Sequence, residues 1–515
     1  MKKISILWVD DEIDLLRAHV IFLEEKGYSV SSVNNASDAI SMVSDQHFDL
    51  VFLDEHMPGM SGLEALNHIK SADPALPVVI ITKSEEEDIM DQAIGAQIAD
   101  YLIKPVSPKQ IILSIKKNVE KRRLVAQKTT SDYQSRFSQL GMDINDCRNM
   151  EDWDRVYRRL VYWEMELSAA GDSTMDEVLR MQKNEANLLF ARFIKKSYLS
   201  WMNMDDRPLM SAEIFPQKIL PLLRDGDQVV MVVIDNLRYD QWLTLYPVIS
   251  EYFLLQDDSL YCSILPTVTQ YARNSMFSGL MPLEIQRRYP QYWIDEDDDT
   301  EKNLYEGELL QYQLDRYRMK TRFHYQKVKN SKVGGKMLKN LSDILENQLC
   351  VFVYNFVDIL SHARTELDMI RELANDEAAY RSLTLSWFEH STLLELFKTL
   401  AQRKVKVVVT TDHGSIRVQN PVKVIGDRQT SSNLRYKQGK NLNYNPKEVF
   451  EVITPGKARL PQANVSSSFI FAEGEDFFAY PNNFNYYSSY YRNTFQHGGV
   501  SLEEMMVPLM TLTPR

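Results

Sequence analysis

Short apolar runs alternate with amphipathic segments along residues 1–107. Three runs have the length and composition of buried strands: Ile4–Val9, Val51–Leu53 and Val78–Ile81. Leu15–Glu25 and Glu64–Lys70 instead carry apolar residues three or four positions apart, which indicates amphipathic helices. Strands that alternate with helices predict a parallel sheet covered by helices, so we expect this region to be an α/β domain.

A long helical region is predicted next. Ser107–Pro108 is typical of an N-cap followed by a first-turn proline, and neither Gly nor Pro occurs from Lys109 to Leu140. We expect one long helix that ends at Gly141. Two more segments, separated by Ala170–Asp172, have apolar residues at helical spacing, which predicts a helical connector or small bundle. These residues are Trp153, Val156, Tyr157, Leu160 and Val161 in the first segment, and Val178, Leu179, Leu188, Leu189 and Phe193 in the second.

The composition shifts again near Arg207–Pro208, where a second α/β pattern begins. Its core strands are expected at Val229–Ile234, Leu349–Phe356 and Val405–Val409. A chain of 515 residues is too long for one ordinary domain. We therefore expect a multi-domain α/β protein with three parts: an α/β domain over 1–120, a helical connector over 121–208 and a second α/β domain over 209–515.

Two polar and aromatic segments interrupt the second α/β pattern. They are Tyr289–Lys329, which contains the acidic run Asp295–Asp299, and the tyrosine-rich segment Phe477–Phe495. We expect both to be surface insertions near a site, because loops carry much of the specificity of a fold. The alternative is a tyrosine-rich surface loop with no binding role.

The charge balance argues against one class of function. The net charge is −12, whereas binding to duplex DNA depends mainly on Lys and Arg side chains that neutralise phosphates. Specific duplex DNA binding is therefore not expected. The run Lys116–Arg123 is most simply a solvated helix face, with a nucleic-acid contact as the alternative. A DNA-reading helix-turn-helix is disfavoured, because the connector helices look too long and show no concentrated basic face.

Cysteine usage and hydropathy indicate a reducing compartment. Cys147, Cys262 and Cys350 are widely spaced, which fits neither a disulfide framework nor a thiolate metal cluster. The first residues lack the apolar core of a signal peptide. No stretch approaches the roughly eighteen apolar residues that a membrane-spanning helix needs. We expect a cytoplasmic protein with no membrane insertion.

Acidic residues end two strands of the first α/β domain. Asp10 and Asp11 follow the first strand, and Asp54 follows the run Val51–Leu53. Because the carboxyl ends of parallel strands line one crevice, these three carboxylates should converge. Their mutual repulsion is usually neutralised by a hard cation such as Mg²⁺, which prefers oxygen ligands. Thr82 and Lys104 end later strands, so their side chains should lie at the same crevice. Asp54 could then accept a phosphoryl group as nucleophile, and Lys104 could neutralise the charge of that group.

The full set resembles the receiver domain of two-component response regulators over residues 1 to 120. The resemblance rests on Asp10, Asp11, Asp54 within Leu-Asp-Glu-His-Met-Pro-Gly-Met-Ser-Gly, Thr82, Tyr101 and Lys104–Pro105. It implies a flavodoxin-like fold, bound Mg²⁺, phosphorylation of Asp54 by a sensor histidine kinase, switch roles for Thr82, Tyr101 and Lys104, and phosphorylation-linked homodimers. Lys83 is bulky where this family usually has a small residue, which puts the phosphate lifetime in doubt.

Candidate metal ligands follow successive elements of the second α/β domain. Asp235 ends the strand Val229–Ile234, and Asp412–His413 follow the strand Val405–Val409. Asp358 and His362 lie four residues apart, so a helix would place them on one face. His497 precedes two glycines, whose flexible backbone lets a ligand approach a metal closely. Acids and imidazoles at these positions are hard to explain by packing alone.

Two threonines precede a predicted helix in the same domain. Thr267 and Thr269 follow Pro266, and residues 270–278 have helical character. Backbone N–H groups at a helix start favour an anion. A hydroxyl there either caps the helix or serves as a metal-activated nucleophile. The local sequence alone favours the cap, whereas the metal-ligand motifs later in the chain favour the nucleophile.

Residues 210–515 resemble the alkaline phosphatase superfamily, in particular its PglZ-type members. Three motifs carry the resemblance: Val-Ile-Asp235-Asn-Leu-Arg238-Tyr-Asp, Thr-Asp412-His413-Gly, and His497-Gly-Gly-Val-Ser-Leu-Glu-Glu-Met-Met-Val-Pro. The resemblance implies an α/β/α fold and two metal ions, one held by Asp358, His362 and His497 and the other by Asp235, Asp412 and His413. Family spacing to the helix glycine points to Thr269, not Thr267, as the nucleophile. The N and O ligands suit two Zn²⁺, with Mn²⁺ as the alternative.

Two positions depart from the family pattern without removing a ligand. Asn236 stands where a small glycine or alanine is common, and Asp240 stands where Glu is usual. Arg273 and Arg238 are candidates for binding the non-bridging phosphate oxygens. Either arginine can instead pair with a nearby acid.

The order of receiver, connector and PglZ-type domain resembles response regulators associated with type IX secretion in Bacteroidetes. That resemblance implies a zinc-dependent phosphodiesterase or phosphatase acting on nucleotides or short oligonucleotides and controlled by Asp54 phosphorylation. The aromatic segments would suit stacking on bases. One alternative is a catalytically silent, metal-bound scaffold that binds a transcription or secretion partner. Another is a DNA-binding regulator, which the acidic charge disfavours.

Overall fold

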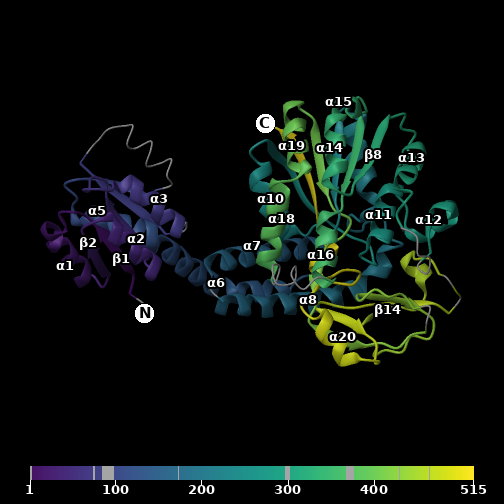
Figure 1. Cartoon of the computed structure of the whole chain (residues 1–515). Helices are drawn as coiled ribbons and strands as arrows, with labels where there is room; N and C mark the ends of the chain where they lie inside the picture. Colours follow the sequence, from purple (N-terminus) through teal and green to yellow (C-terminus); the bar gives the residue numbers. More distant parts are fainter. Residues whose placement is uncertain are drawn as a thin grey trace. The chain divides into compact units, whose positions relative to one another are not determined.

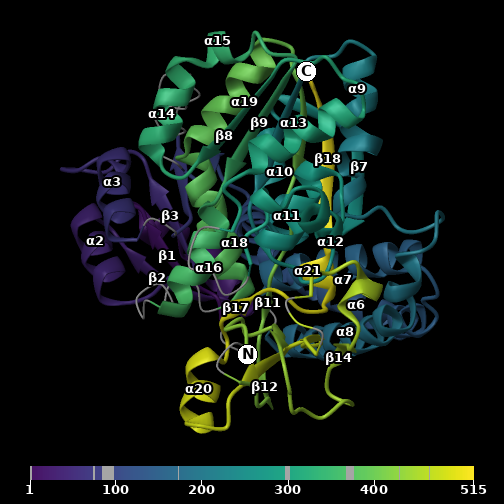
Figure 2. The same ribbon diagram turned by 90° about the vertical axis from the view of Figure 1, so that its right-hand side faces the viewer.

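The structure of the chain is a computed structural model, shown in Figures 1 and 2. It describes residues 3–73, 76–83, 98–171, 173–295, 302–366, 376–427, 430–462, 464 and 466–515. The chain forms two compact units. The first comprises residues 1–135 and 169–172, and the second comprises residues 136–168 and 173–515.

The first unit is built on a parallel five-stranded sheet of order β2-β1-β3-β4-β5. Alternate residues of the strands enter two separate cores, with Leu7 and Val9 on one face and Ile6 and Trp8 on the other. Burial on both faces explains why three of these strands are continuous apolar runs in the sequence. The strands are β1 (Ser5–Val9), β2 (Ser29–Val33), β3 (Leu50–Asp54), β4 (Val78–Thr82) and β5 (Asp100–Ile103), and the described helices are η1 (Ile13–Leu16), α1 (Arg17–Glu25), α2 (Ala36–Asp45), α3 (Gly62–Ala72) and α5 (Pro108–Ile115).

The helical region after the sheet is longer than expected. Ser107 caps α5 through a capping box with Gln110. A π-helical segment, Lys116–Glu120, then joins α5 to α6 (Lys121–Asn145). The predicted stop at Gly141 is wrong, because the last turns of α6 pack on another connector helix. Gln182 Nε2 donates to the Phe137 carbonyl at 2.9 Å, and a Cβ at Gly141 would lie 3.6 Å from the same amide.

Two further helices complete the connector, α7 (Met150–Ala170) and α8 (Ser173–Trp201). All five apolar positions predicted for the first of them are buried. On α8, however, Leu188 is 52% exposed, while Leu179, Phe190 and Ile194 are buried. The buried stripe of α8 therefore overlaps the expected face at Leu179 but leaves Leu188 outside it. By its contacts, most of the connector belongs with the C-terminal unit, and the domain boundaries at 121 and 208 stay a prediction.

The C-terminal unit is built on a mixed six-stranded sheet of order β7-β18-β10-β6-β9-β8. Strands β10, β6, β9 and β8 run parallel, whereas β18 is antiparallel to both β10 and β7. The strands are β6 (Val229–Ile234), β7 (Phe253–Cys262), β8 (Phe323–Val328), β9 (Leu349–Tyr354), β10 (Lys406–Thr410) and β18 (Met506–Pro514).

Helices cover both sides of this sheet, with α10, α18 and α19 on one side and α11, α12 and α13 on the other (Figure 1). The predicted α/β/α class of this domain is thereby confirmed. The helices are α9 (Leu220–Arg224), α10 (Tyr239–Ile249), α11 (Thr269–Ser278), α12 (Pro282–Arg288), α13 (Glu306–Arg316), α14 (Ser331–Lys339), α15 (Leu341–Ile344), α16 (Phe356–Glu366), α18 (Glu377–Glu389) and α19 (Thr392–Gln402). Within the described ranges, no helix combines the length and the apolar character that crossing a membrane requires.

The two segments expected as insertions are more regular than predicted. Tyr289–Lys329 contains α13 and β8, and β8 is the edge strand of the main sheet, with Phe323 opposite Leu349. The sequence of β8 contains several polar residues, so it was not predicted as a strand. These residues are tolerated because β8 lies at the edge of the sheet and is only partly buried. Asp295 is exposed, and residues 296–299 lie outside the described residues.

Phe477–Phe495 is likewise not a plain loop. It forms β16 (Asp476–Ala479), the tyrosine-bearing helix α20 (Phe484–Tyr491) and β17 (Phe495–Gln496). These elements belong to small sheets inserted between β10 and β18, seen at the lower edge of Figure 1. The remaining elements there are β11 (Ile416–Arg417), β12 (Asn420–Lys423), β13 (Tyr436–Gly439), β14 (Phe450–Val452), η6 (Pro455–Ala458), β15 (Ser468–Phe471) and α21 (Leu502–Met505).

Candidate metal centres

Strand ends place the first set of predicted ligands. Asp235 directly follows β6. Asp412 and His413 come shortly after Thr410, the last residue of β10. Because β6 and β10 are neighbouring parallel strands, their carboxyl ends lie at one edge of the sheet. One ligand atom from each of the three side chains lies within 4.8 Å of the others, and all three side chains are buried.

The hydrogen bonds of this group orient its ligand atoms toward one another. The His413 Nδ1 lies 3.1 Å from the Gly414 carbonyl, which leaves Nε2 to face the two acids. Asn355 Nδ2 donates to Asp235 Oδ2 at 3.0 Å. Within the described part of the chain, the buried Asp412 Oδ2 accepts no hydrogen bond. A buried carboxylate oxygen without a donor costs free energy, and a cation would offset that cost.

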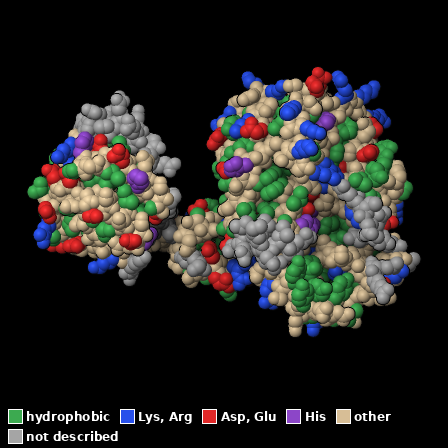
Figure 3. All heavy atoms as spheres, viewed as in Figure 1, with side chains coloured by type: hydrophobic (Ala, Val, Ile, Leu, Met, Phe, Trp, Pro, Cys, Tyr) green, Lys and Arg blue, Asp and Glu red, His purple; other side chains and the backbone are tan. Residues whose placement is uncertain are grey.

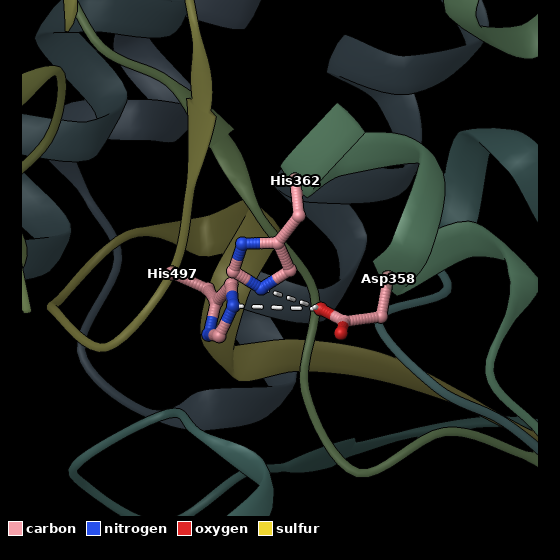
Figure 4. A group of neighbouring side chains, drawn as sticks. All are labelled: Asp358, His362 and His497. Carbon is pink, nitrogen blue, oxygen red and sulfur yellow. Dashed lines mark ion pairs between the residues drawn. The ribbon is translucent and has the colours of Figure 1, made fainter. Parts of the chain in front are cut away.

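The second group joins α16 to the segment after β17. Asp358 and His362 lie one turn apart on α16. The Nε2 atom of His362 lies 3.5 Å from Asp358 Oδ1, and the Nε2 atom of His497 lies 3.5 Å from the same oxygen. Figure 4 shows both imidazoles turned toward this carboxylate. His497 Nδ1 lies 3.3 Å from the Thr267 carbonyl, a contact that orients a ligating imidazole through its other nitrogen.

The two groups adjoin. The rings of His413 and His497 stack with centroids 4.3 Å apart, and His362 meets His497 edge-on at 5.8 Å. Four separate stretches of chain therefore supply six N and O ligand atoms to neighbouring positions. Tetrahedral sites of this ligand type suit Zn²⁺. The residues fit a two-metal centre.

The electrostatics of the apoprotein favour a cation at these positions. Burial raises the pKa of Asp235 to about 6. The Asp412 carboxylate adds to this rise, and the Arg273 guanidinium opposes it. Burial also raises the pKa of Asp358, and the nearby Asp235 carboxylate adds to that rise. Burial, together with His413 and His362, lowers the pKa of His497 well below its ordinary value. His497 therefore stays neutral, with a lone pair available for a metal.

Metal affinity is expected to fall as the pH drops below about 6. Asp235 has a raised pKa of about 6 in the folded apoprotein, so it carries a proton below that pH and must lose it to ligate. His497 does not compete, since its pKa is depressed. Titration with Zn²⁺ against a competing chelator at pH 5 to 8 measures this dependence. An affinity that stays constant across that range would contradict the proposed role of Asp235.

Thr269 is the hydroxyl that faces the first group. It is the first residue of α11, and its Oγ1 lies 3.3 Å from His413 Nε2 and 3.4 Å from Asp235 Oδ1. Thr267 is instead fully buried, where it donates to the Gly499 carbonyl and accepts from the Gly498 N–H, both at 3.0 Å. The hydroxyl of Thr267 thus holds the glycines next to His497, and the hydroxyl of Thr269 is the one at the ligands.

Arg273 lies one helical turn after Thr269 and is completely buried. Its Nη1 donates to Asp235 Oδ2 at 2.7 Å and its Nε donates to Glu306 Oε1 at 2.5 Å. Among the described residues, no acceptor bonds its Nη2. Arg238, the other predicted arginine, does not line this cavity; it forms a bidentate pair with Asp240 at 2.9 and 2.5 Å. Of the two alternatives for Arg238, the structure supports pairing with an acid.

A cavity of about 520 Å³ opens at the two groups. Its lining includes Thr269, Arg273, Asp358, His362 and His497. It also includes residues that the motifs did not single out: Lys302, Asn303, Asn355, Asn433 and Tyr436. Asn355 directly follows β9, so the same strand-end rule that found Asp235 could have found it had the strand been ended at Tyr354. The others come from segments that were expected to be surface insertions or were not assigned.

The receiver residues also converge. Asp10, Asp11 and Asp54 lie within 4.8 Å of one another by one oxygen each, with Asp10 and Asp54 buried and Asp11 exposed. Lys104 Nζ lies 2.8 Å from Asp10 Oδ2 and 2.9 Å from Asp54 Oδ2, and its peptide bond to Pro105 is cis. Burial raises the pKa of Asp54, an effect that the Lys104 hydrogen bond opposes. Three oxygen ligands at one point fit Mg²⁺.

The switch residues are placed less directly. Thr82 is buried, and its hydroxyl donates to the Glu55 carboxylate, next to Asp54 in the chain. Tyr101 is half-buried against the core that contains Val9 and Leu53. The bulky Lys83 side chain extends to Glu12, with Nζ 3.4 Å from Oε2. The hydroxyl of Thr82 is therefore engaged with Glu55 in this structure.

Three family models match successive parts of the chain. The response regulator receiver domain matches residues 6–116, the PorX response regulator linker domain matches 123–202, and the BREX system PglZ alkaline phosphatase-like domain matches 214–512.

The similar curated proteins match the receiver region. The alginate biosynthesis transcriptional regulatory protein AlgB of Pseudomonas syringae is 39% identical over 138 residues, which are 27% of this chain and 31% of that protein. The transcriptional regulatory protein ResD of Bacillus subtilis is 34% identical over 112 residues, 22% of this chain and 46% of that protein. This chain thus spans less than half the length of either relative. A CheY-like receiver structure from Methanospirillum hungatei is 25% identical, with a TM-score of 0.23, and covers 23% of this chain and 96% of that one.

Proposed function

We propose that this protein hydrolyses phosphate diesters at a two-metal centre. The chain belongs to the family of PglZ alkaline phosphatase-like domains, and a receiver and a linker precede that domain in the order of a PorX-type response regulator. The observation that carries the proposal is the position of the Thr269 hydroxyl, 3.3 Å from His413 Nε2 and 3.4 Å from Asp235 Oδ1. A nucleophile belongs at such a place, beside ligands and at a helix start.

Each metal ion would have three protein ligands. Asp358, His362 and His497 would hold one ion, and the other would be held by the group at the strand ends, Asp235, Asp412 and His413. Two bound Zn²⁺ ions, or Mn²⁺ as the alternative, would supply the Lewis acidity that lowers the pKa of a hydroxyl and stabilises the charge on a phosphoryl group.

Thr269 would act as the nucleophile. Its Oγ1 would attack phosphorus in line with one of the two ester alcohols, the bond from phosphorus to that alcohol would break, and the alcohol would leave with the proton of the threonine hydroxyl. The second alcohol stays on phosphorus, so the intermediate is a phosphodiester between Thr269 and that alcohol. Water would then cleave the bond from phosphorus to Thr269 Oγ1, which returns a proton to the hydroxyl and releases a phosphate monoester. Thr269 is the first residue of α11, and a helix start favours an anion, so the phosphoryl group would lie at the positive end of this helix.

Arg273 would bind a non-bridging oxygen of the substrate. Asp235 and Glu306 hold two of its nitrogens, and its Nη2 has no hydrogen bond among the described residues. An arginine fixed by two acids keeps its geometry before substrate arrives, which favours stabilisation of the transition state. Arg273 lies in the lining of the cavity, as this role requires.

A nucleotide or short oligonucleotide is the substrate class that the surroundings favour. Tyr436 lines the cavity, and Leu434 of the same lining packs against a small hydrophobic cluster that Phe484 and Tyr491 of α20 also contact. Tyr486 is 62% exposed on that helix, and Figure 3 shows a hydrophobic patch on this lower part of the C-terminal unit. Aromatic side chains stack on bases without sequence preference. On the face drawn in Figure 3, acidic and basic side chains are interspersed. Duplex DNA binds best to a continuous basic surface, so this face does not favour a duplex as substrate.

The receiver would couple this output to a sensor histidine kinase. Phosphorylation of Asp54, with Mg²⁺ held by Asp10, Asp11 and Asp54, would be read by Thr82, Tyr101 and Lys104 and would promote homodimers. The PorX-type order supports a role in type IX secretion in the cytoplasm, through a transcription or secretion-machinery partner.

Metal analysis combined with a phosphate-ester screen tests this function. We expect two equivalents of Zn²⁺ per chain and turnover of a chromogenic phosphodiester, measured with and without Asp54 phosphorylation and with chain mass determined in parallel. Zinc at this stoichiometry with no turnover above background would support the alternative, a catalytically silent scaffold for a protein partner. Absence of any transition metal would remove the two-metal mechanism.

A further inference from the structure

A network of charged side chains, buried except at the partly exposed Glu164 and Lys183, ties the connector to the α/β part of the C-terminal unit. It lies entirely within the C-terminal unit, beside a cavity of about 270 Å³ that is separate from the metal cavity in its lining. Its members come from five helices and hold three positive and three negative charges. They are Glu164 of α7, Lys183 and Asn187 of α8, Arg238 and Asp240 of α10, with Arg238 its N-cap, Arg381 of α18 and Glu503 of α21.

One arm of the network reaches the segment that carries His497. Lys183 Nζ lies 2.5 Å from Glu164 Oε2 and 3.3 Å from Glu503 Oε1. Asn187 Nδ2 donates to Glu503 Oε2 at 3.0 Å, and the Leu502 N–H donates to Asn187 Oδ1 at 2.8 Å. Helix α21 therefore begins on side chains from α8. It begins only five residues after His497.

The same end of α21 also abuts the Asp412–His413 turn. The Gly414 N–H donates to the Glu504 carbonyl at 3.2 Å. A Cβ at Gly414 would lie 2.1 Å from the Glu503 carbonyl oxygen, so the two backbones approach as closely as glycine permits. A displacement of Glu503 would therefore be transmitted to the ligands on both sides of this contact.

The other arm reaches the segment that carries Asp235. Arg381 Nη1 lies 2.9 Å from Glu164 Oε1 and 3.1 Å from Asp240 Oδ2. Asp240 in turn binds Arg238 through two hydrogen bonds. Arg238 and Asp240 begin α10 directly after the turn that follows Asp235. Glu164 thus stands where the two arms meet, one carboxylate oxygen serving each.

Burial makes the pairing in this network strict. Arg238, Asp240, Arg381 and Glu503 are all buried, as is Asn187. Charges held away from water must be paired, and removal of one partner leaves its neighbour buried and uncompensated. The charge of Lys183 and Arg381 lowers the pKa of Glu164 despite its burial. The ionised network therefore resists rearrangement, and it holds both segments through fixed contacts.

We infer that Glu164, Lys183 and Asn187 are positioning residues of the metal centre, which makes the connector part of the catalytic framework. None of the three lines the metal cavity. They act through Glu503 on the His497 and His413 side and through Arg381 and Asp240 on the Asp235 side. The inference rests on the proposed function only for its activity readout, because metal affinity is a separate measurement.

The test uses the full-length protein with lysine variants of one helix. Lys183→Met removes the charge at the junction, Lys183→Arg keeps it, and Lys196→Met makes the same change at an exposed lysine of α8. Affinity is measured by Co²⁺ titration followed by visible absorption, kcat and KM with a chromogenic phosphodiester, and the unfolding temperature without metal. We expect Lys183→Met to weaken Co²⁺ binding about ten-fold and to lower kcat more than it raises KM. Lys183→Arg should recover most of both, and Lys196→Met should match the parent protein.

The outcomes separate three explanations. Equal Co²⁺ affinity and kcat in Lys183→Met and Lys196→Met, with only a lower unfolding temperature in the former, would overturn the inference and leave the network as packing. A parent protein that binds Co²⁺ but does not turn over the ester would sink the proposed hydrolysis, while a loss of affinity in Lys183→Met would still support the positioning role. A parent protein that takes up no Co²⁺ overturns both. Glu164→Gln with Lys183→Met as a double-mutant cycle adds a second measure, and additive effects would speak against a shared network.

Discussion

Thr269→Ala is expected to lower kcat for phosphodiester hydrolysis on the order of 10³-fold or more, since loss of a catalytic nucleophile costs at least that much in hydrolases. The Oγ1 of Thr269 is the hydroxyl that lies against both His413 Nε2 and Asp235 Oδ1, at 3.3 and 3.4 Å. No hydroxyl at residue 269 means no covalent phosphoryl transfer. Steady-state kinetics with a chromogenic diester, at saturating metal, measures the effect.

Two control variants make this result specific. Thr269→Ser keeps a hydroxyl at the same place and should retain much of the turnover, while metal content should be equal in both Thr269 variants and the parent. Thr267→Val removes the other candidate hydroxyl, whose bonds to Gly498 and Gly499 hold the segment next to His497. That variant should weaken metal binding first. Full activity in Thr269→Ala would show that the reaction uses a different nucleophile.

Removal of metal is expected to abolish hydrolysis and to lower the unfolding temperature, with Zn²⁺ restoring both. Asp235 and Asp412 are buried side by side, and the pKa of Asp235 is raised to about 6. Without a cation these carboxylates repel each other in a low-dielectric site. A ligand that binds only the folded state stabilises it by about 4 kcal/mol when present at a thousand times its Kd. Chelation followed by calorimetry and an activity assay measures the loss.

A chelator would also strip Mg²⁺ from the receiver, so a variant has to locate the effect. His413→Ala removes one ligand of the C-terminal centre and leaves Asp10, Asp11 and Asp54 intact. In that variant, Zn²⁺ should no longer stabilise the C-terminal unit to the same extent, whereas Mg²⁺ binding to the receiver should be unchanged. A chelated parent protein with unaltered unfolding and activity would argue that the acids and imidazoles are structural.

Some features were visible in the sequence because they follow from local rules. Strands buried on both faces, such as Val229–Ile234 and Val78–Ile81, are continuous apolar runs, and each lies in the predicted place. Asp10 and Asp54 end such strands in the first unit, and Asp235 ends one in the second, so within each unit the gathering of ligands at one edge of the sheet follows from parallel order. Ser107–Pro108 is likewise a helix start in the structure.

Other features were hidden because distant residues decide them. β8 is half-polar and pairs with β9 only as an edge strand, so its letters resemble a loop. Gly141 looks like a helix stop, yet packing against α8 continues the helix to Asn145. Leu188 fits the helical spacing but is exposed, because the neighbouring positions Ala186, Asn187 and Phe190 form the buried side of α8.

The amino-acid sequence alone determined which side chains are candidates to bind metal and phosphate, because their chemistry and their places at strand and helix ends are local properties. Only the tertiary structure decided what surrounds them. It separated the hydroxyl of Thr269 from that of Thr267, paired Arg238 with Asp240 instead of the cavity, and joined Lys183 to Glu503 across 320 positions of chain. Burial and charge pairing arise between segments that meet only after folding, and no spacing along the chain encodes them.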